Sequence, residues 1–326
     1  MLSYFLLAAT AVANVGAVPY KRADQECTNP QKRIEWRELG STDQQGYIDA
    51  VLCLKTKPSR RGLDTPLYDD FPHVHFELAD YVHHYASFLP WHRYFTHVYE
   101  QALRECGYTG PMTYWDWTLD VQKLAQSPVM ASTLGFGGDG SDQRTETLPD
   151  GETLRCVDSG PFSDLRPAYR AISPTEILQK DHCLHRGLID GDDPNAVIMA
   201  ESYNATSVET VSQLANFTSF APRLEGSPHG AIHASLGGEM NPTTSPNVPE
   251  PLFFLHHAQV DRIWWLWQQQ NPEVRELDYA GARRTPESVS GVPATSNDTL
   301  QMLGLAEDIP VKDVLNTYNS KLCYTY

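Results

Sequence analysis

The spacing of the histidines constrains the fold of this chain more than any other feature. Nine of its twelve histidines fall in two groups. The groups are His73, His75, His83, His84 and His92, and His229, His233, His256 and His257. His229 and His233 are four residues apart, so a helix places both rings on one face, one turn apart. Each group therefore offers three imidazoles to one metal ion, if helices bring its members together.

The residues near these histidines narrow the metal chemistry. Neither a His-Glu-x-x-His nor a Glu-x-x-His pattern occurs, which argues against a zinc metalloprotease and a di-iron carboxylate bundle. Sites made only of imidazole suit copper, zinc, iron or nickel, and copper binds most tightly in the intrinsic order. Imidazoles alone leave copper and zinc open, although six of them without a carboxylate make a zinc hydrolase or a structural metal protein the weaker alternative.

Other histidines are expected not to bind metal, because a single histidine on a helix is more often a core or surface residue. Adjacent rings on a helix point about 100° apart. One ring of each doublet, His83-His84 and His256-His257, is therefore expected to face away. The expected non-ligands are His73, His84, His97, His182, His185 and His256. His182 and His185 are three residues apart and have no third partner in the sequence, so both are expected at the surface.

Apolar periodicity predicts a mainly α-helical domain. The clearest helical segments are 32–54 (with a break near Gly40), 76–85, 94–106 and 253–269. A shorter helix is expected from His229 to Leu236, with Ser227 as its N-cap and Gly237-Gly238 as its end. Residues 134–161 and 237–251 are rich in Gly, Pro, Ser and Asp, which is typical of functional or disulfide-held loops. Strand signals are few and short.

The N-terminus predicts export. An apolar stretch over 4–15 and the small residues Val15-Gly16-Ala17 predict a signal peptide over 1–17. The stretch is too short to span a membrane. The dibasic pair Lys21-Arg22 predicts a short propeptide over 18–22 and a single domain over 23–326. A formal charge of −16 argues against nucleic acid and anionic membranes as partners.

Cysteines and sequons agree with a secreted protein. The six cysteines are dispersed and include no Cys-x-x-Cys pair, so three disulfides are predicted rather than a metal cluster. Their spacing leaves the pairing open. Acceptor sequons for N-glycosylation begin at Asn204, Asn216 and Asn297.

Two long motifs resemble the copper signatures of tyrosinases and catechol oxidases. The first runs from His83 through Phe88-Leu89-Pro90-Trp91-His92-Arg93 to Glu100. The second runs from Pro251 through His256-His257 to Asp261-Arg262, with Glu250 where the family usually has Asp. Three further segments resemble landmarks of the family: Tyr68-Asp69-Asp70-Phe71 ahead of His75, Tyr114-Trp115-Asp116-Trp117, and Tyr324-Thr325-Tyr326. The resemblance covers the chain from about Arg33 to its last residue.

The resemblance implies an antiparallel four-helix bundle that holds two copper ions and is wrapped by long loops. By position, the ligands would be His75, His83 and His92 for the first copper, and His229, His233 and His257 for the second. Asp261, one turn after His257, would accept a hydrogen bond that fixes a ligand ring; an ion pair with a neighbouring Arg at the helix surface is the alternative. The implied activity is oxidation of small phenols to o-quinones with O2 as co-substrate.

Departures from the family pattern narrow this activity. Many fungal members link a Cys to the ligand matching His83, but Tyr81 stands at that position, so no thioether is expected. Members that hydroxylate monophenols often carry Asn after the first ligand of the second copper, helped by an upstream Glu. Here those positions are Gly230 and Phe220. With no side chain to help deprotonate a monophenol, oxidation of o-diphenols is favoured.

The resemblance also bears on access to the site. Thr244 stands where some relatives carry a bulky gate, which predicts an open pocket; the alternative is that Thr244 is a turn residue. The chain stops at the tyrosine motif, so no C-terminal lid domain is expected. Two other functions remain as alternatives: an oxidase for one phenolic intermediate of a biosynthetic pathway, and a hemocyanin-like O2 carrier, which should have its site shielded by an extra domain.

Overall fold

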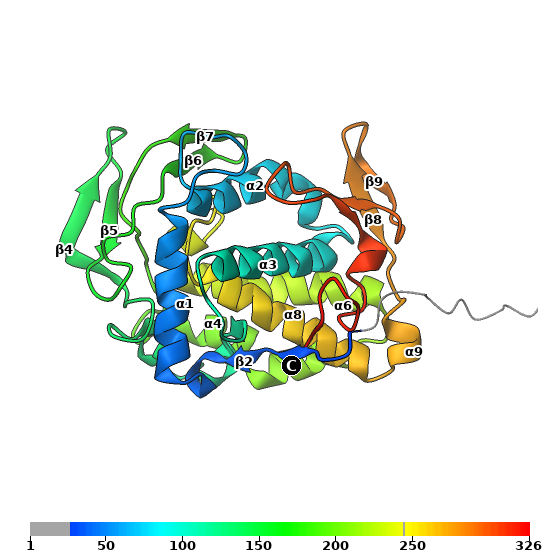
Figure 1. The fold of residues 1–326 in the computed structure, drawn as a ribbon. Coiled ribbons are helices and arrows are strands. Elements are labelled where there is room, and N and C mark those ends of the chain that lie inside the picture. The colour runs from blue at the N-terminus through cyan, green and yellow to red at the C-terminus, as the bar shows by residue number, and fades with distance from the viewer. Residues whose placement is uncertain (1–26, 244) are drawn as a thin grey trace, which may run out of the picture.

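The computed structural model of the protein describes residues 27–243 and 245–326. Both predicted leader segments, 1–17 and 18–22, and the candidate pocket residue Thr244 lie outside the described residues. The core contains four long helices, α1 (Ser41–Leu54), α2 (Leu67–Val82), α3 (Phe88–Glu105) and α8 (Phe253–Gln269). Helices α3 and α8 pack against each other at the centre (Figure 1). The predicted mainly α-helical architecture is confirmed.

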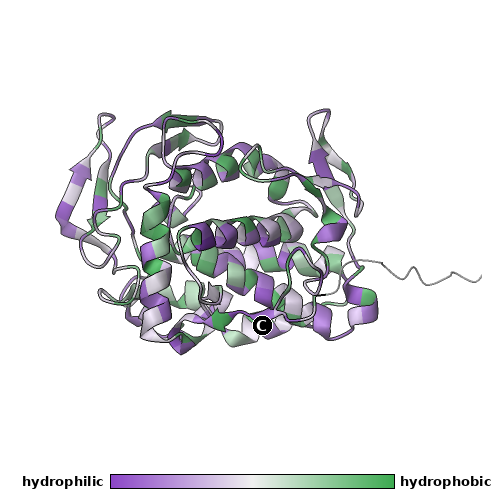
Figure 2. Ribbon diagram, viewed as in Figure 1, coloured by the Kyte–Doolittle hydropathy of each residue, from purple (hydrophilic) through white to green (hydrophobic). Residues whose placement is uncertain are grey.

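Burial explains why these segments form helices. Helix α3 buries aromatic and aliphatic residues on several sides, among them Trp91, Phe95 and Tyr99. The first three turns of α8 are almost entirely buried. Large side chains fill the space between the helices, and the fully buried tryptophans are Trp36, Trp91, Trp115, Trp117, Trp264 and Trp267. Such a core stabilises helices through packing rather than intrinsic propensity. Apolar residues accordingly concentrate in the helical core, and the outlying β4–β5 hairpin is mostly hydrophilic (Figure 2).

Shorter helices complete the second half of the core. They are α4 (Ala196–Tyr203), α5 (Ala205–Ser212), α6 (Phe217–Leu224), the π-helical turn η5 (Glu225–His229), α7 (Gly230–Leu236) and α9 (Pro272–Arg275). Turns of 3-10 helix cover Trp36–Glu38 (η1), Trp117–Leu119 (η2), Leu124–Gln126 (η3), Pro128–Met130 (η4), Gly238–Met240 (η6) and Val311–Asp313 (η7).

The described strands are short and pair two by two. Three antiparallel hairpins project from the core: β4 (Gly140–Thr147) with β5 (Thr153–Val157), β6 (Tyr169–Ser173) with β7 (Glu176–Gln179), and β8 (Ala282–Thr285) with β9 (Ser288–Pro293). The remaining pairs are β1 (Gln31–Lys32) with β12 (Tyr324–Thr325), β2 (Ile34–Glu35) with β3 (Thr113–Tyr114), and β10 (Thr299–Leu300) with β11 (Ile309–Pro310). The segment 134–161, expected as a loop, thus contains the β4–β5 hairpin.

Three disulfides are present, as predicted, and the structure supplies their pairing. They are Cys27–Cys323, Cys53–Cys106 and Cys156–Cys183. The second ties the end of α1 to the end of α3, and the third ties β5 to the segment after β7. Among the residues described, no helix is both long enough and apolar enough to cross a membrane.

Helix boundaries differ from the sequence prediction where tertiary pairing or burial decides them. The apolar pattern predicts a helix over residues 32–40, but Lys32, Ile34 and Glu35 lie in β1 and β2, because they pair with the C-terminal strand and with β3. The turn η1 follows them. Helices α2 and α3 begin well before residues 76 and 94, with Pro90 within the first turn of α3, where its missing N–H costs nothing. The limits of α8 agree with the prediction.

Ser227 is not the N-cap of the short helix. Its backbone is extended (φ −164°, ψ 125°) inside η5. Its hydroxyl donates a hydrogen bond to the carbonyl oxygen of Ser202 at 2.8 Å instead. The helical run therefore begins before His229, within a π-helical turn, a feature that local sequence preferences do not signal.

Candidate metal centre

The first histidine set comes from two consecutive helices. His75 lies on α2, His83 is the C-terminal cap of α2, and His92 lies on α3. Their ring centroids are 5.0 Å (His75–His83), 5.0 Å (His83–His92) and 5.7 Å (His75–His92) apart. Nitrogen atoms of the three rings lie within 4.8 Å of one another, which places them within reach of one metal ion.

The second set comes from η5, α7 and α8. His229, His233, His256 and His257 bring nitrogen atoms within 4.8 Å of one another. His257 stacks on His92 of the first set, with ring centroids 4.2 Å apart and planes inclined by 9°. The two sets therefore adjoin, and the structure brings together all six histidines that the family resemblance singles out.

The histidine doublets behave differently from each other. His84 points away, with its side chain 89% exposed, as expected. In the other doublet both His256 and His257 are buried, and both contribute nitrogen atoms to the second set. His256 stacks on His229 (5.1 Å between centroids) and approaches Trp117 (6.3 Å). The start of α8 is enclosed on all sides, so neither ring reaches solvent.

Backbone carbonyls orient four of the rings. Three rings donate Nδ1–H to the carbonyl four residues earlier: His83 to Ala79 at 3.0 Å, His92 to Phe88 at 2.8 Å and His229 to Glu225 at 2.8 Å. His233 instead donates to the carbonyl of Met240 at 2.7 Å. Because a carbonyl only accepts, Nδ1 carries the proton and Nε2 keeps a free lone pair in each ring.

The free lone pairs of these rings lie close enough together to bind a metal ion. The Nε2 atoms of His229 and His233 lie 3.0 Å apart, and both carry lone pairs, so a cation between them removes their repulsion. The other buried nitrogens without a hydrogen-bond partner among the described residues include Nε2 of His92 and both nitrogens of His75, His256 and His257. Buried polar atoms are normally paired, and a bound metal ion would give the free lone pairs of such nitrogens a partner.

Burial also keeps the imidazoles neutral, as metal binding requires. It lowers the pKa of His83 and of His233 to about 4. It lowers the pKa of His75, His92, His229 and His257 well below the usual value. The rings are therefore deprotonated at neutral pH even before a metal arrives.

Asp261 does not hold a ligand ring, contrary to expectation. Its buried carboxylate accepts hydrogen bonds from Arg33 (3.1 Å), Arg93 (2.5 Å), Tyr326 (2.6 Å) and Tyr324. Arg93 follows His92 on α3, and Asp261 lies one turn after His257 on α8. The carboxylate therefore ties together the two helices whose rings stack.

The sequence prediction missed one carboxylate of the pocket, Glu225. Phe220, taken as the position matching the family's upstream Glu, instead stacks on Trp267 in the core (4.6 Å between centroids). The buried carboxylate of Glu225 lines the pocket and accepts the His84 backbone N–H at 2.6 Å. Burial, partly offset by that N–H, raises the pKa of Glu225 to about 7. The available signal was its position four residues, about one turn, before His229.

A pocket of about 820 Å³ opens onto both histidine sets. Its metal-facing wall is made by His75, His83, His229 and His233. The side walls are largely apolar, from Phe76, Ala79, Pro174, Pro242, Pro246 and Val248. Gly230 also lines the pocket, as Glu225 does, and adds no side chain. The cavity is concave, mostly apolar and carries a few polar groups, as is typical of a small-molecule site.

A helical core that presents two adjoining sets of neutral imidazoles to one pocket defines a dinuclear metal protein. Comparison with known proteins identifies the family of dinuclear metal proteins to which the chain belongs. The family described as the common central domain of tyrosinase matches residues 66–270. The chain therefore belongs to the tyrosinase family, is an oxidoreductase, and uses two copper ions with O2 as co-substrate and a phenol as substrate.

Relatives along almost the whole chain support this conclusion. The tyrosinase-like protein phomQ1 of Diaporthe leptostromiformis is 42% identical over 311 residues (93% of this chain, 79% of that protein). The N-acetyl-6-hydroxytryptophan oxidase ivoB of Emericella nidulans is 30% identical (98% and 99%). Among solved structures, a point mutant of a polyphenol oxidase from Thermothelomyces thermophila superposes with a TM-score of 0.77 at 27% identity (91% and 88%).

Proposed function

We propose that His75, His83 and His92 hold the first copper, and that His229, His233 and His257 hold the second. The carbonyl contacts at Nδ1 and the unpartnered Nε2 atoms support this assignment. The choice of His257 over His256 rests on position, because His257 stacks on His92 between the two sets. His256 lies behind His229, against Trp117.

The reaction proposed for this site is oxidation of o-diphenols to o-quinones. Each o-diphenol gives up two electrons and two protons, so two of them reduce one O2 to two waters. When bound, the copper pair supplies the two-electron redox chemistry. The imidazoles would hold the metals beside the pocket, its apolar walls would exclude water around the phenol ring, and Glu225 would accept a phenolic proton there. The observation that carries the proposal is the pair of imidazole sets opening into one apolar pocket.

Removal of the Glu225 side-chain base tests its role. A base must be deprotonated to act, so the oxidation rate should rise with pH through the pKa of Glu225, which is near neutral. We expect Glu225→Gln to abolish this rise and to slow turnover on the order of a hundredfold, with both coppers retained. Quinone formation measured across pH, with copper content as the control, checks this. An unchanged pH profile would exclude Glu225 as the base.

Gly230 restricts hydroxylation of monophenols, in our proposal, because no side chain there works with Glu225. A Cβ at Gly230 meets only the carbonyl of Glu225, at 3.4 Å, so a side chain fits the helix. We expect Gly230→Asn to raise monophenol hydroxylation roughly tenfold or more while o-diphenol oxidation changes little. Gly230→Ala, which adds bulk without the amide, is the matched control. Equal effects of both variants, or rapid tyrosine hydroxylation by the unaltered enzyme, would contradict this restriction.

A second candidate function is oxidation of one bulky phenolic intermediate. A pocket of about 820 Å³ is much larger than one phenol ring needs, and one relative is named for a substituted hydroxytryptophan. This candidate predicts that kcat/KM rises steeply as catechols carry larger apolar substituents. Similar values across such a series would favour the general o-diphenol oxidase.

We also propose that the protein is secreted through the signal peptide over 1–17, with a mature domain over 23–326. The three disulfides support an oxidising compartment. Asn204, Asn216 and Asn297 are the proposed glycan acceptors, and the last two are exposed. Mass spectrometry of the protein recovered from culture medium tests both the new N-terminus and the glycans.

A further inference from the structure

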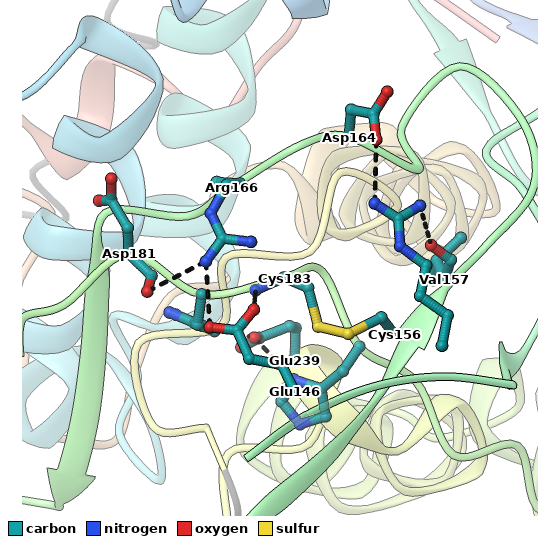
Figure 3. Close-up of a disulfide and its surroundings, with 11 residues drawn as sticks. Glu146, Cys156, Val157, Asp164, Arg166, Asp181, Cys183 and Glu239 are labelled. Atoms are coloured by element: carbon teal, nitrogen blue, oxygen red, sulfur yellow. Dashed lines mark hydrogen bonds and ion pairs between the residues drawn. A yellow bond between two sulfur atoms is a disulfide. The ribbon is translucent and has the colours of Figure 1, made fainter. Parts of the chain in front are cut away.

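A buried acid–imidazole cluster lies outside the pocket. We call His182, His185 and Glu239 the Glu239 cluster. Glu239 Oε1 lies 2.7 Å from Nε2 of His182 and 2.8 Å from Nδ1 of His185. The Glu239 side chain is fully buried, and the two rings are 1% and 14% exposed, so the surface position expected for both histidines is wrong. Glu239 lies near the Cys156–Cys183 disulfide (Figure 3).

The hydrogen bonds of His182 fix its charge. Its Nε2 faces the Glu239 carboxylate, and its Nδ1 faces the carbonyl of Lys180 at 2.8 Å. Both partners only accept, so both ring nitrogens carry protons and the ring is cationic. The cluster therefore contains a buried ion pair, which is retained only where the geometry satisfies both charges. Ser245 adds a third side-chain donor to the carboxylate, at 2.5 Å.

The cluster fixes the turn η6 (Gly238–Met240) against residues 185–187. The backbone N–H of Glu239 donates to the carbonyl of His185 at 3.1 Å, so both its side chain and its main chain are held by that segment. The approach is close, because a Cβ at Gly238 would lie 2.2 Å from the carbonyl oxygen of His185. The turn therefore cannot move without breaking the cluster.

The same turn orients a histidine of the metal centre. His83, His92 and His229 donate to carbonyls four residues earlier along the chain. His233 is the exception, since its acceptor is the carbonyl of Met240, in η6 and next to Glu239. The tautomer and the orientation of His233 thus depend on a turn that the cluster holds in place, rather than on its own helix.

We propose that Glu239 is a positioning residue for the second copper. Held between His182 and His185, it fixes the turn whose Met240 carbonyl accepts the Nδ1–H of His233, and Nε2 of His233 then faces the metal. The Cys156–Cys183 disulfide anchors the segment that carries both cluster histidines. The proposal rests on the ligand assignment proposed above. Such indirect contacts to a ligand are commonly worth tenfold to about a hundredfold in metal affinity.

The test measures Cu(II) affinity at each set separately, by competition with a chelator of known affinity. Full-length His92→Ala leaves the second set intact, and full-length His257→Ala leaves the first. Glu239→Gln should weaken Cu(II) binding about tenfold or more in the His92→Ala protein and leave the His257→Ala protein unchanged. Glu146→Gln is the matched control, because Glu146 accepts the Cys183 N–H in the same region and should alter neither affinity.

Two results would overturn the proposal. The first is an unchanged Cu(II) affinity at the second set, and the second is an equal decrease at both sets, which would indicate a general destabilisation of the protein. Should Glu239→Gln not fold, His185→Ala replaces it, because His185 is at the edge of the cluster. His185→Asn restores an N–H near the Nδ1 position and should recover the affinity that His185→Ala loses; no recovery would count against the proposal. Two coppers retained by His257→Ala would refute the ligand assignment instead.

Discussion

Replacing His257 by alanine is expected to remove one of the two copper ions and to abolish quinone formation. His257 stacks on His92 between the two sets, and both its nitrogens are buried without a partner among the described residues. Among the described residues, the second set consists of histidines and contains no carboxylate that could replace His257 as a ligand. Loss of one metal removes several kcal/mol of transition-state stabilisation, a rate decrease on the order of a thousandfold or more.

His256→Ala provides the matched control for this prediction. It removes an adjacent buried imidazole from the same helix turn and leaves a similar cavity. We expect it to keep two coppers per chain and most of the activity, at the cost of some stability. Copper analysis of both purified variants decides between the two histidines. Loss of copper from His256→Ala, with His257→Ala unaffected, would reverse their proposed roles.

Replacing Asp261 by alanine is expected to produce the largest loss of stability. The carboxylate lies between the guanidinium groups of Arg33 and Arg93, all three groups being buried. Removal of the acid leaves the buried Arg93 without its acidic partner and leaves Arg33 with Glu100 alone, which costs about 3–5 kcal/mol in the free energy of unfolding. Chemical denaturation of the metal-free protein measures the effect without the contribution of bound copper.

The pH dependence gives this prediction a second readout. Burial alone would raise the pKa of Asp261, but Arg93 and Arg33 outweigh it and lower the pKa. A lowered pKa stabilises the fold above the unfolded value of about 3.9 and loses that effect as the pH falls. The stability difference between the unaltered protein and Asp261→Ala should therefore shrink in acid. A constant difference across pH would contradict the ion-pair explanation.

Asp142→Ala is the control for the two Asp261 predictions. Asp142 pairs with Arg155 at 2.8 Å, but its side chain is 79% exposed. An exposed pair of this kind contributes roughly 0–1 kcal/mol. Comparable destabilisation by both variants would mean that burial is not the reason for the expected loss.

The sequence predicts those parts of the site that depend on local periodicity and long motifs. The limits of α8 follow from the apolar pattern over 253–269, and the family motifs select the six histidines that the fold brings together. Both are properties of contiguous residues, and a helix converts their spacing into position directly. The mainly helical core and the presence of disulfides follow for similar reasons.

The parts that the sequence does not predict depend on contacts between distant segments. Lys32, Ile34 and Glu35 lie in strands because they pair with β12 and β3. Glu225 lines the pocket from the first residue of the π-helical turn that ends at His229. The sequence around His182 predicts a surface residue. The fold instead buries it against Glu239, which lies more than fifty residues further along the chain. Neither the strand pairing nor the contact between His182 and Glu239 leaves a local pattern in the sequence.

Metal analysis combined with an activity assay on the same sample tests the central claim most directly. The purified protein is analysed for copper and zinc, and catechol is then added in air while quinone is followed by absorbance. Two coppers per chain and rapid quinone formation, lost on chelation and restored by copper but not by redox-inert zinc, are the predicted result. Zinc in place of copper, or two coppers without any quinone, would contradict the assignment of this site as a phenol-oxidising dicopper centre.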